Sequence, residues 1–397
     1  MINPLRHLAL VLLAGLFTPP LHAEDDGIAR RVSLPPLAGA SPDPSFGPDA
    51  VVVNRGNLVH TRQFLASGTA EDRFGLPGLI AELESLCQSH QLELAQVAKL
   101  NLYVDTTQEG VLSAVHEVLA DTWSTEAGPA LTLIHSGLPG GAMVAADAII
   151  AAPAGGGSET LSITPDSATL PAHRDILQVS GRAARSGTLE EATRETMAQL
   201  LRVIAEAGSG PSDVVQVKTF LQPMEQWEHA KKAIEEAFGE HPVPPIVIVE
   251  WTSSLPTEIE MIAATPNRAE TTETVTFFTP EGDKPSPVFS RVARVHADQV
   301  IFVSGIPTAS NETAFEETKR VFARLHDVTT SAGSDLRHLA KATYYVSDDQ
   351  FSKQLNEVRP HVYDPERPPA ASKVEVSSTG NGASKMVMDF IAVPAAP

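Results

Sequence analysis

Histidine, serine and glycine form the spaced motifs that most often carry chemistry, and this chain holds none of the familiar ones. Its 13 histidines are scattered, without the H-E-x-x-H spacing that brings two imidazoles to one metal ion. It also lacks a P-loop, a G-x-S-x-G turn and a G-x-G-x-x-G loop. The glycine run at 155–157 lies between periodic segments, which is typical of a linker and not of a phosphate cradle.

Cys87 is the only cysteine, so the chain cannot form an internal disulfide. Leu83 and Leu86 place it on the apolar side of a predicted helix. A thiol buried in apolar surroundings is held in its unreactive, protonated form. We therefore interpret Cys87 as a packed, inert residue and not as a nucleophile.

The length and charge of the chain restrict its class and its partners. A chain of 397 residues, 42% of them hydrophobic, is long enough for two to four globular domains. Acidic residues outnumber basic ones by 49 to 29, which gives a formal charge of −20. Because such a surface repels phosphate backbones and anionic membranes, we expect neither nucleic acid nor a membrane among the partners.

The first 23 residues have the pattern of a secretory signal peptide. Arg6 and His7 precede an apolar core at 8–17, and Ala23 offers a small residue for cleavage. The core is too short to span a bilayer, which argues against the alternative of an uncleaved anchor. The sequence thus predicts an exported protein, periplasmic or secreted. Residues 24–49, rich in Pro, Ser, Gly and Asp, are predicted to be a linker or a wrapped arm.

The segment from His173 to Thr265 alternates between strand and helix patterns. Thr188 and Glu191 stand in capping-box positions, and Gly208 is placed to end the helix that follows. The order is a strand at 176–180, a helix at 188–207, a strand at 214–221, a helix at 227–238 and strands at 246–251 and 258–263. This order predicts an α+β unit with both helices on one side of a mixed sheet.

Four motifs in this segment, in this order, resemble the Rid family, also called YjgF or endoribonuclease L-PSP. They are VSG at 179–181, EAG followed by SDVVQVKTFL at 206–221, VEW at 249–251 and LPTEIEMIA at 255–263. The resemblance covers the whole segment. It implies the chorismate-mutase-like fold of that family.

The same pattern recurs upstream and downstream of the central segment. LASG at 65–68 and FVSG at 302–305 are interpreted as counterparts of VSG, and Pro77 is expected to begin the first helix of the upstream copy. The spacing to the acidic residue of the closing strand is similar in the three copies: 80 residues for Ser67–Asp147, 80 for Ser180–Glu260 and 85 for Ser304–Asp389. We therefore predict three Rid-like units at 50–153, 159–265 and 273–397, with a first strand of the third unit at 274–279.

The resemblance also implies how the units assemble. Rid proteins are typically homotrimers with helices outside, sheets inside and ligand sites between subunits. Three units in one chain are expected to close the same ring as an internal pseudo-trimer, so that the chain is a monomer in solution. The alternative is three units that do not pack on one another.

Active Rid proteins hydrolyse imines and enamines derived from amino acids, and the resemblance implies no metal or organic cofactor. An arginine in a Pro-Ala-Arg-Ser/Thr frame binds the substrate carboxylate through two parallel hydrogen bonds, which lysine cannot reproduce. A glutamate on the closing strand assists the reaction. Here the arginine position holds Leu131, Ile246 and Ala371, and the glutamate position holds Ala145, Glu258 and Val387. No unit has both groups.

Other residues could take the place of the missing arginine. Lys373 lies two positions after Ala371 on the same strand face, and Arg367 precedes the Pro-Pro pair. Each is either a ligand-binding cation or a solvated surface charge. Asn356, Ser180 and Ser304 fall at or near positions that contribute to family sites. Glu258 is either a functional group or an interface carboxylate.

Three hypotheses remain open from the sequence. The first is a binding protein that holds a small metabolite, such as a carboxylate, between its units. The second is a deaminase with a rebuilt site around Glu258, for which Ile246→Arg is expected to be the best single route to activity. The third is a scaffold whose clefts are closed by Leu131, Ile246 and Ala371. The charge of −20 argues against the ribonuclease activity recorded in the family's name.

Overall fold

The computed structural model describes residues 28–35, 47–124, 126–153, 159–185, 187–308, 312–379 and 384–395. The predicted signal peptide at 1–23 lies outside these residues. Within the described ranges, no helix combines the length and apolarity that a bilayer crossing requires.

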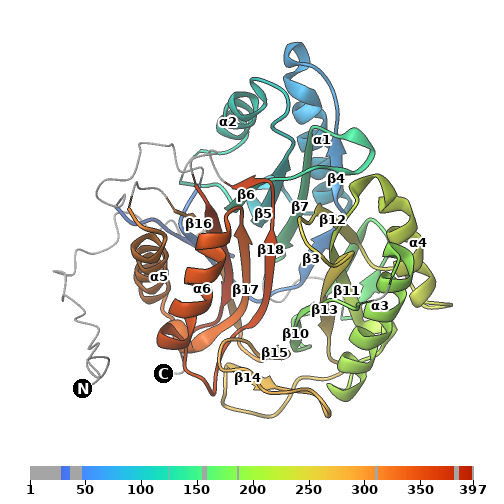
Figure 1. The fold of residues 1–397 in the computed structure, drawn as a ribbon, viewed down its shortest axis with the longest axis vertical. Coiled ribbons are helices and arrows are strands. Elements are labelled where there is room, and N and C mark those ends of the chain that lie inside the picture. Colours follow the sequence, from blue (N-terminus) through green and yellow to red (C-terminus); the bar gives the residue numbers. More distant parts are fainter. Residues whose placement is uncertain are drawn as a thin grey trace.

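Three α+β units follow one another along the chain, each with two long helices against one sheet (Figure 1). The first unit contains β3 (Leu58–Thr61), β4 (Phe64–Ala66), α1 (Leu76–Ser89), β5 (Val97–Val104), α2 (Val111–Thr122), β6 (Ala130–His135) and β7 (Val144–Ala151). The second contains β10 (Ile176–Arg182), α3 (Leu189–Glu206), β11 (Val214–Leu221), α4 (Trp227–Ala237), β12 (Ile246–Glu250) and β13 (Thr257–Ala264). The third contains β16 (Gln299–Pro307), α5 (Ala314–Ser331), β17 (Leu339–Val346), α6 (Asp349–Val362), β18 (Ala370–Glu375), β19 (Ser378–Thr379) and β20 (Met386–Ala392).

The local signals that predict the helices are confirmed. The Thr188 hydroxyl accepts the backbone N–H of Glu191 at 3.2 Å, and the Glu191 carboxylate accepts that of Thr188 at 3.2 Å, a complete capping box at the start of α3. Gly208 follows α3 at a φ of +84°, which is the left-handed region that favours glycine. Pro77 lies in the first turn of α1, as expected.

Each unit is preceded along the chain by a pair of strands that joins the sheet of a different unit. β14 (Val275–Phe278) and β15 (Val292–Val295) extend the sheet of the second unit, where Val295 pairs with Ile176. β8 (Ser162–Ile163) and β9 (Ser167–Leu170) extend the first sheet, and β1 (Ala29–Val32) and β2 (Ala50–Asn54) extend the third. The strand predicted at 274–279 therefore exists but belongs to the second sheet. The predicted arm at 24–49 contributes β1. A strand pattern fixes a strand but not its partner, and here each hairpin covers an edge of another unit's sheet.

The equivalence of LASG at 65–68 with VSG is wrong. The register pairs Val179 with Met261 in the second unit and His60 with Ile149 in the first. The closing strands of the two units can be superposed by matching Glu260 with Asp147. In this superposition, Arg62 and Gln63 of the first unit take the positions of Ser180 and Gly181 in the second. The strand of the first unit carries no Ser-Gly to mark this position, so a nearby Ser-Gly misled the alignment.

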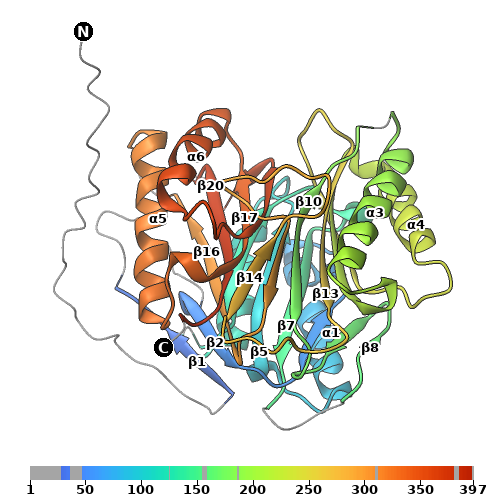
Figure 2. The same cartoon turned by 90° about the horizontal axis from the view of Figure 1, so that it is seen from below.

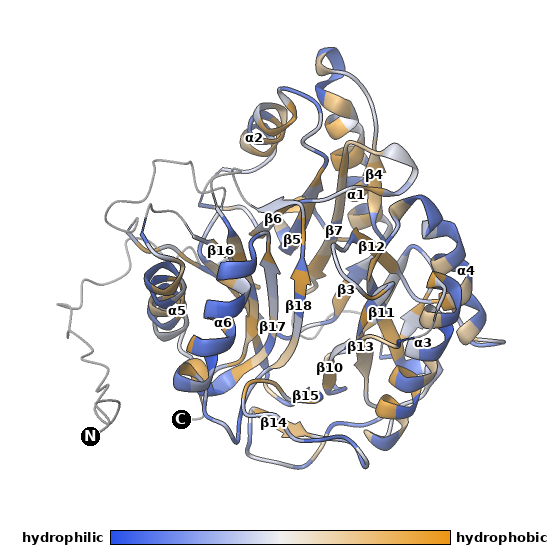
Figure 3. Cartoon of the chain, in the orientation of Figure 1, coloured by the Kyte–Doolittle hydropathy of each residue, from blue (hydrophilic) through white to orange (hydrophobic). Residues whose placement is uncertain are grey.

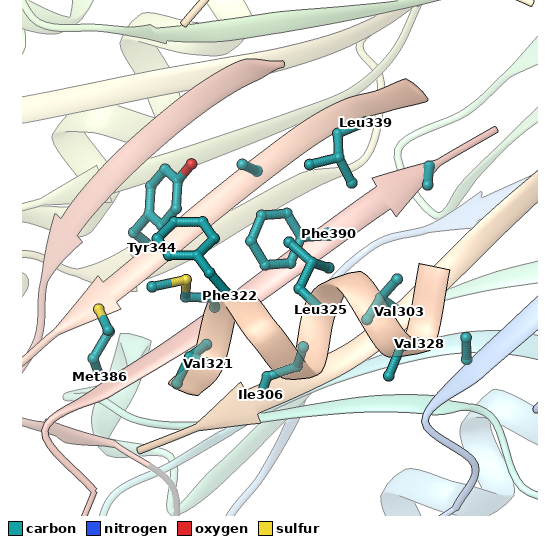
Figure 4. Close-up of a cluster of buried hydrophobic side chains, with 14 of the residues drawn as sticks. Val303, Ile306, Val321, Phe322, Leu325, Val328, Leu339, Tyr344, Met386 and Phe390 are labelled. Carbon is teal, nitrogen blue, oxygen red and sulfur yellow. The ribbon is translucent and has the colours of Figure 1, made fainter. Parts of the chain in front are cut away.

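Each unit buries an apolar core between its helices and its sheet. Figure 4 shows that of the third unit, where Phe322 and Leu325 of α5 pack against Tyr344 and Phe390 of the sheet. Figure 3 shows the matching pattern on the ribbon, with hydrophilic residues on the outer sides of the helices and hydrophobic ones along the strands. Cys87 is buried in the core of the first unit, and burial raises the pKa of its thiol to about 12, which agrees with a packed, inert residue.

The inner faces of the three sheets meet in the middle of the molecule, with the helices at its periphery (Figure 2). Two shared apolar clusters lie there, each built from all three units, one of them around Tyr103, Phe220 and Tyr345. Between the clusters lies a polar layer of buried ion pairs. Its pairs join different units: Lys99–Asp389 at 2.6 Å, Lys341–Glu260 at 2.6 Å and Lys218–Asp147 at 3.5 Å.

Candidate functional site at the junction of the second and third units

The second–third junction is the place where β10 and β13 of the second unit meet β18 of the third. The Ser180 hydroxyl accepts the backbone N–H of Ala371 at 2.7 Å and donates to the carbonyl oxygen of Ser290 at 2.5 Å. The backbone N–H of Gly181 donates to the Ser372 hydroxyl at 3.1 Å. These bonds fix the edge of β18 against β10, so residues of both units line one site.

Glu258 lies at this junction, partly buried beneath Gly181. A Cβ added to Gly181 would stand 2.1 Å from the Glu258 Oε1 atom, so only glycine permits this approach. The backbone N–H of Lys373 lies close enough to the Glu258 carboxyl group to act on its pKa, which it lowers slightly against larger opposing effects. Burial, and after it the neighbouring charge of Glu260, raise the pKa of Glu258 to about 7. Glu258 is therefore a carboxyl group poised to exchange a proton near neutral pH.

Glu260, two residues further along β13, has the opposite electrostatic character. Its carboxylate accepts hydrogen bonds from the Lys341 ammonium at 2.6 Å and from the Ser372 hydroxyl at 2.5 Å. Burial alone would raise the pKa of Glu260, but the nearby charges of Lys341 and Lys218 outweigh it and lower that pKa. Glu260 thus stays ionised next to Glu258, and its charge helps to keep the Glu258 proton in place.

Lys373 contributes a cation to the same junction. Its ammonium donates to the Ser352 hydroxyl of α6 at 2.9 Å, and it is only partly exposed. Burial, and next the charge of Arg359, lower the pKa of Lys373, whereas the nearby carboxylate of Glu258 acts to raise it. The junction therefore brings a proton-exchanging carboxyl group and a cation together, each from a different unit.

The two other junctions have no comparable groups at the matching positions. At the third–first junction, Val387 replaces Glu258, and a Cβ added to Gly305 would lie 2.8 Å from the Val387 side chain. At the first–second junction, the Gln63 side chain bonds both backbone polar groups of Ile248, at 2.8 and 3.1 Å. Gln63 occupies the place that Gly181 leaves free for Glu258. The asymmetry follows from these single residue differences.

The remaining residues singled out from the sequence have structural contacts. Ser304 joins the third unit to the first, since its hydroxyl accepts the backbone N–H of Leu131 at 2.9 Å. Arg367 bonds Glu273 at 3.1 Å and the carbonyl oxygen of Val275 at 3.0 Å, away from Glu258. Asn356 is exposed on α6, where its side-chain oxygen accepts from Arg359 at 2.6 Å.

Ile246 does not share a site with Glu258, which corrects the expectation attached to Ile246→Arg. Its strand, β12, faces the first unit: the Glu250 carboxylate accepts the backbone N–H of Gly137 at 3.0 Å. The arginine position that faces Glu258 is Ala371, on the third unit. The expected gain from Ile246→Arg required both groups to come from one unit, whereas the site is built across two.

Sequence reasoning also missed Arg359, Gln63 and the lysines of the polar layer. A signal for the lysines was present, because AKLNLYV at 98–104 and AKATYYV at 340–346 repeat a lysine, Lys99 and Lys341, within otherwise mostly apolar runs. Gln63 was hidden by the misplaced Ser-Gly match. No periodic signal marks Arg359, whose importance depends on what surrounds it.

A separate cavity of about 420 Å³ lies at the start of α3 in the second unit. Its described lining consists of Thr188, Gln222, Gln226 and Ser254 together with apolar residues and glycine, none of which is titratable. Within the described residues, no cluster of three or more His, Cys, Asp or Glu side chains is placed to hold a metal ion. The chemistry of the site thus depends on the groups at the second–third junction.

Comparisons with known proteins give one family. The model of the family described as endoribonuclease L-PSP matches residues 167–265 and 282–393, together more than half of the chain. No curated protein gives a match. Solved structures that resemble the chain include a YjgF-family protein from Neisseria meningitidis (24% identity, 30% of this chain and 95% of that one, TM-score 0.23). A YjgF/YER057c/UK114-family protein from Mycobacterium tuberculosis is another (21% identity, 30% and 98%, TM-score 0.22). The matched segments are the second and third units, and the chain belongs to the endoribonuclease L-PSP family, also called YjgF or Rid.

Proposed function

We propose that the chain binds a small carboxylate derived from an amino acid at the second–third junction. The observation that carries this proposal is Glu258, whose pKa of about 7 is set by burial and by Glu260. Strongly shifted pKa values gather at functional sites, because catalysis and binding use groups that other residues hold out of their ordinary ionisation state. Lys373 supplies a positive charge for the ligand carboxylate, and family membership favours a ligand of this class.

Binding of 2-oxobutanoate, a stable keto acid, should weaken as pH rises through 7. Ionisation of Glu258 places a second negative charge near the bound carboxylate. The other nearby charged residues, Glu260, Lys341 and Lys373, are the same in the wild-type chain and in the variants compared. We expect the dissociation constant to rise several-fold between pH 6 and pH 8 in titration calorimetry, and Glu258→Gln to remove most of that rise. Glu250→Gln, at the first–second junction, is the matched control and should keep it. A wild-type affinity that does not change over this range would contradict the proposal.

Imine hydrolysis is a second candidate, which Glu258 specifically favours. A carboxyl group with a pKa near the working pH can donate a proton to the imine nitrogen and accept one from the attacking water. The products are a keto acid and ammonia. The absence of an arginine at position 371 leaves the substrate carboxylate without the bidentate contact that the family uses.

Ala371→Arg should therefore increase turnover of 2-iminobutanoate, generated in situ, by about tenfold or more, because a charged bidentate contact contributes on the order of 2 kcal/mol. Ile246→Arg places the same side chain on the strand that faces the first unit and should give no increase. Ammonia release measures both, after circular dichroism has confirmed that each variant is folded. Equal turnover by the two variants would contradict a role for Glu258 in the reaction.

A further inference from the structure

Within the described residues, Arg359 is a buried guanidinium without a carboxylate partner. It lies on α6 with 8% of its surface exposed, and its Cζ atom is 5.0 Å from the centre of the Tyr344 ring. One of its nitrogens donates to Asn356 at 2.6 Å, but its Nε atom is buried and has no hydrogen-bond partner among the described residues. In the described part of the chain, no Asp or Glu oxygen lies within 4.0 Å of it. A buried charge left in this state is costly unless something else pairs with it.

Lys373 brings a second cation to the same place. It lies on β18, where it pairs with Tyr344 of the neighbouring strand β17, and Figure 1 shows α6 over this part of the sheet. The two charges act on each other, since Arg359 is among the causes that lower the pKa of Lys373, second only to burial. The carboxylates of Glu258, Glu375 and Asp349 lie near enough to act on Lys373, yet none of them forms an ion pair with it in the described structure.

We propose that Arg359 and Lys373 together form the subsite that binds the carboxylate group of the ligand. This inference rests on the proposed function and names the residues that would recognise the charged end of the ligand. A carboxylate has two oxygens and one negative charge. One oxygen can accept from the Arg359 guanidinium and the other from the Lys373 ammonium, which pairs both cations and relieves the repulsion between them.

The position of Lys373 relates this subsite to Glu258. The backbone N–H of Lys373 lies close enough to the Glu258 carboxyl group to act on its pKa, whereas the Lys373 side chain extends toward α6 and donates to Ser352 at 2.9 Å. A ligand bound along this edge would thus extend only from the backbone of Lys373 to its side chain, so the ligand must be small. Its carboxylate would bind at Arg359 and Lys373, and its carbonyl or imine end would lie toward Glu258.

The subsite also gives a physical reason for the loss of the family arginine. Ala371 precedes Lys373 on the same face of β18 and packs with the core of the third unit. In this chain the cation comes from the helix above the strand, and position 371 is left to packing.

The test measures the affinity of the full chain for 2-oxobutanoate and for its methyl ester, which lacks the charge. Lys373→Met should raise the dissociation constant of the acid by about tenfold or more and leave that of the ester unchanged. Arg359→Gln should act in the same way, and Arg359→Lys should recover part of the affinity by restoring the charge. Lys353→Met, an exposed lysine on the same helix, is the matched control and should have no effect.

The outcomes separate this inference from the function on which it rests. If Lys373→Met binds the acid as tightly as the wild-type chain does, the proposed subsite is wrong and the proposed function still stands. Wild-type chain that binds neither probe overturns both. Because Lys373 lies at a partly exposed sheet edge, Lys373→Met tests the subsite even if Arg359→Gln fails to fold.

Discussion

Glu258→Gln should be more stable than the wild-type chain at pH 9, by up to about 3 kcal/mol, and the two should be equally stable near pH 4. Glutamine keeps the shape and the neutral state of the protonated carboxyl group. The expected difference follows from a folded-state pKa of about 7 against an ordinary value of 4.5. Urea unfolding, followed by circular dichroism across this pH range, measures it.

The sign follows from which state binds the proton more tightly. Below pH 4.5 the carboxyl group of Glu258 is protonated in both the folded and the unfolded chain, so it contributes no pH dependence. Between 4.5 and 7 the unfolded chain releases this proton while the folded chain keeps it, and the free energy of unfolding falls as pH rises. Above about 7 the loss is complete and constant.

Glu260→Gln is the matched control, two residues away on the same strand. Because the charges of Lys341 and Lys218 lower the pKa of Glu260, its ionised form stabilises the folded chain. This variant should lose stability at pH 9, the opposite direction from Glu258→Gln. A difference between Glu258→Gln and wild type that does not vary with pH would show that Glu258 has an ordinary pKa.

Lys341→Met should destabilise the chain by about 3–5 kcal/mol at neutral pH. The Lys341 ammonium is buried and bonds Glu260 at 2.6 Å and Ser372 at 3.2 Å. Its removal leaves the Glu260 charge buried without its cation, and this costs far more than the net stabilisation that the pair itself provides. Chemical unfolding measures the loss.

The double variant Lys341→Met with Glu260→Gln tests this explanation. Since both charges are removed, most of the lost stability should return. If the single variant loses less than about 1 kcal/mol, the ion pairs between units are surface-like, and the polar layer does not hold the units in register.

The helices and strands of the second unit could be predicted from the sequence because their signals are local. A hydroxyl and a carboxylate three residues apart, or a glycine after an apolar stripe, act on the backbone beside them. The strand at 214–221 and the capping box at Thr188 are confirmed for this reason. The recurrence of these signals revealed the repeated units as well.

Features that depend on which unit contacts which could not be predicted in the same way. The strand pattern of β14 gives no indication that it completes the second sheet, and the motif of Ile246 gives no indication that β12 faces the first unit. Arg359 is unremarkable in the sequence and becomes informative only once it is found buried beside Lys373. Glu258 could be named as a candidate, but its partners come from the third unit.

The most direct test of the central claim is a crystal structure of the chain with 2-oxobutanoate. We expect one molecule at the second–third junction, with its carboxylate at Arg359 and Lys373 and its carbonyl group toward Glu258. A molecule bound instead at either of the other two junctions, or in the cavity at the start of α3, would contradict it.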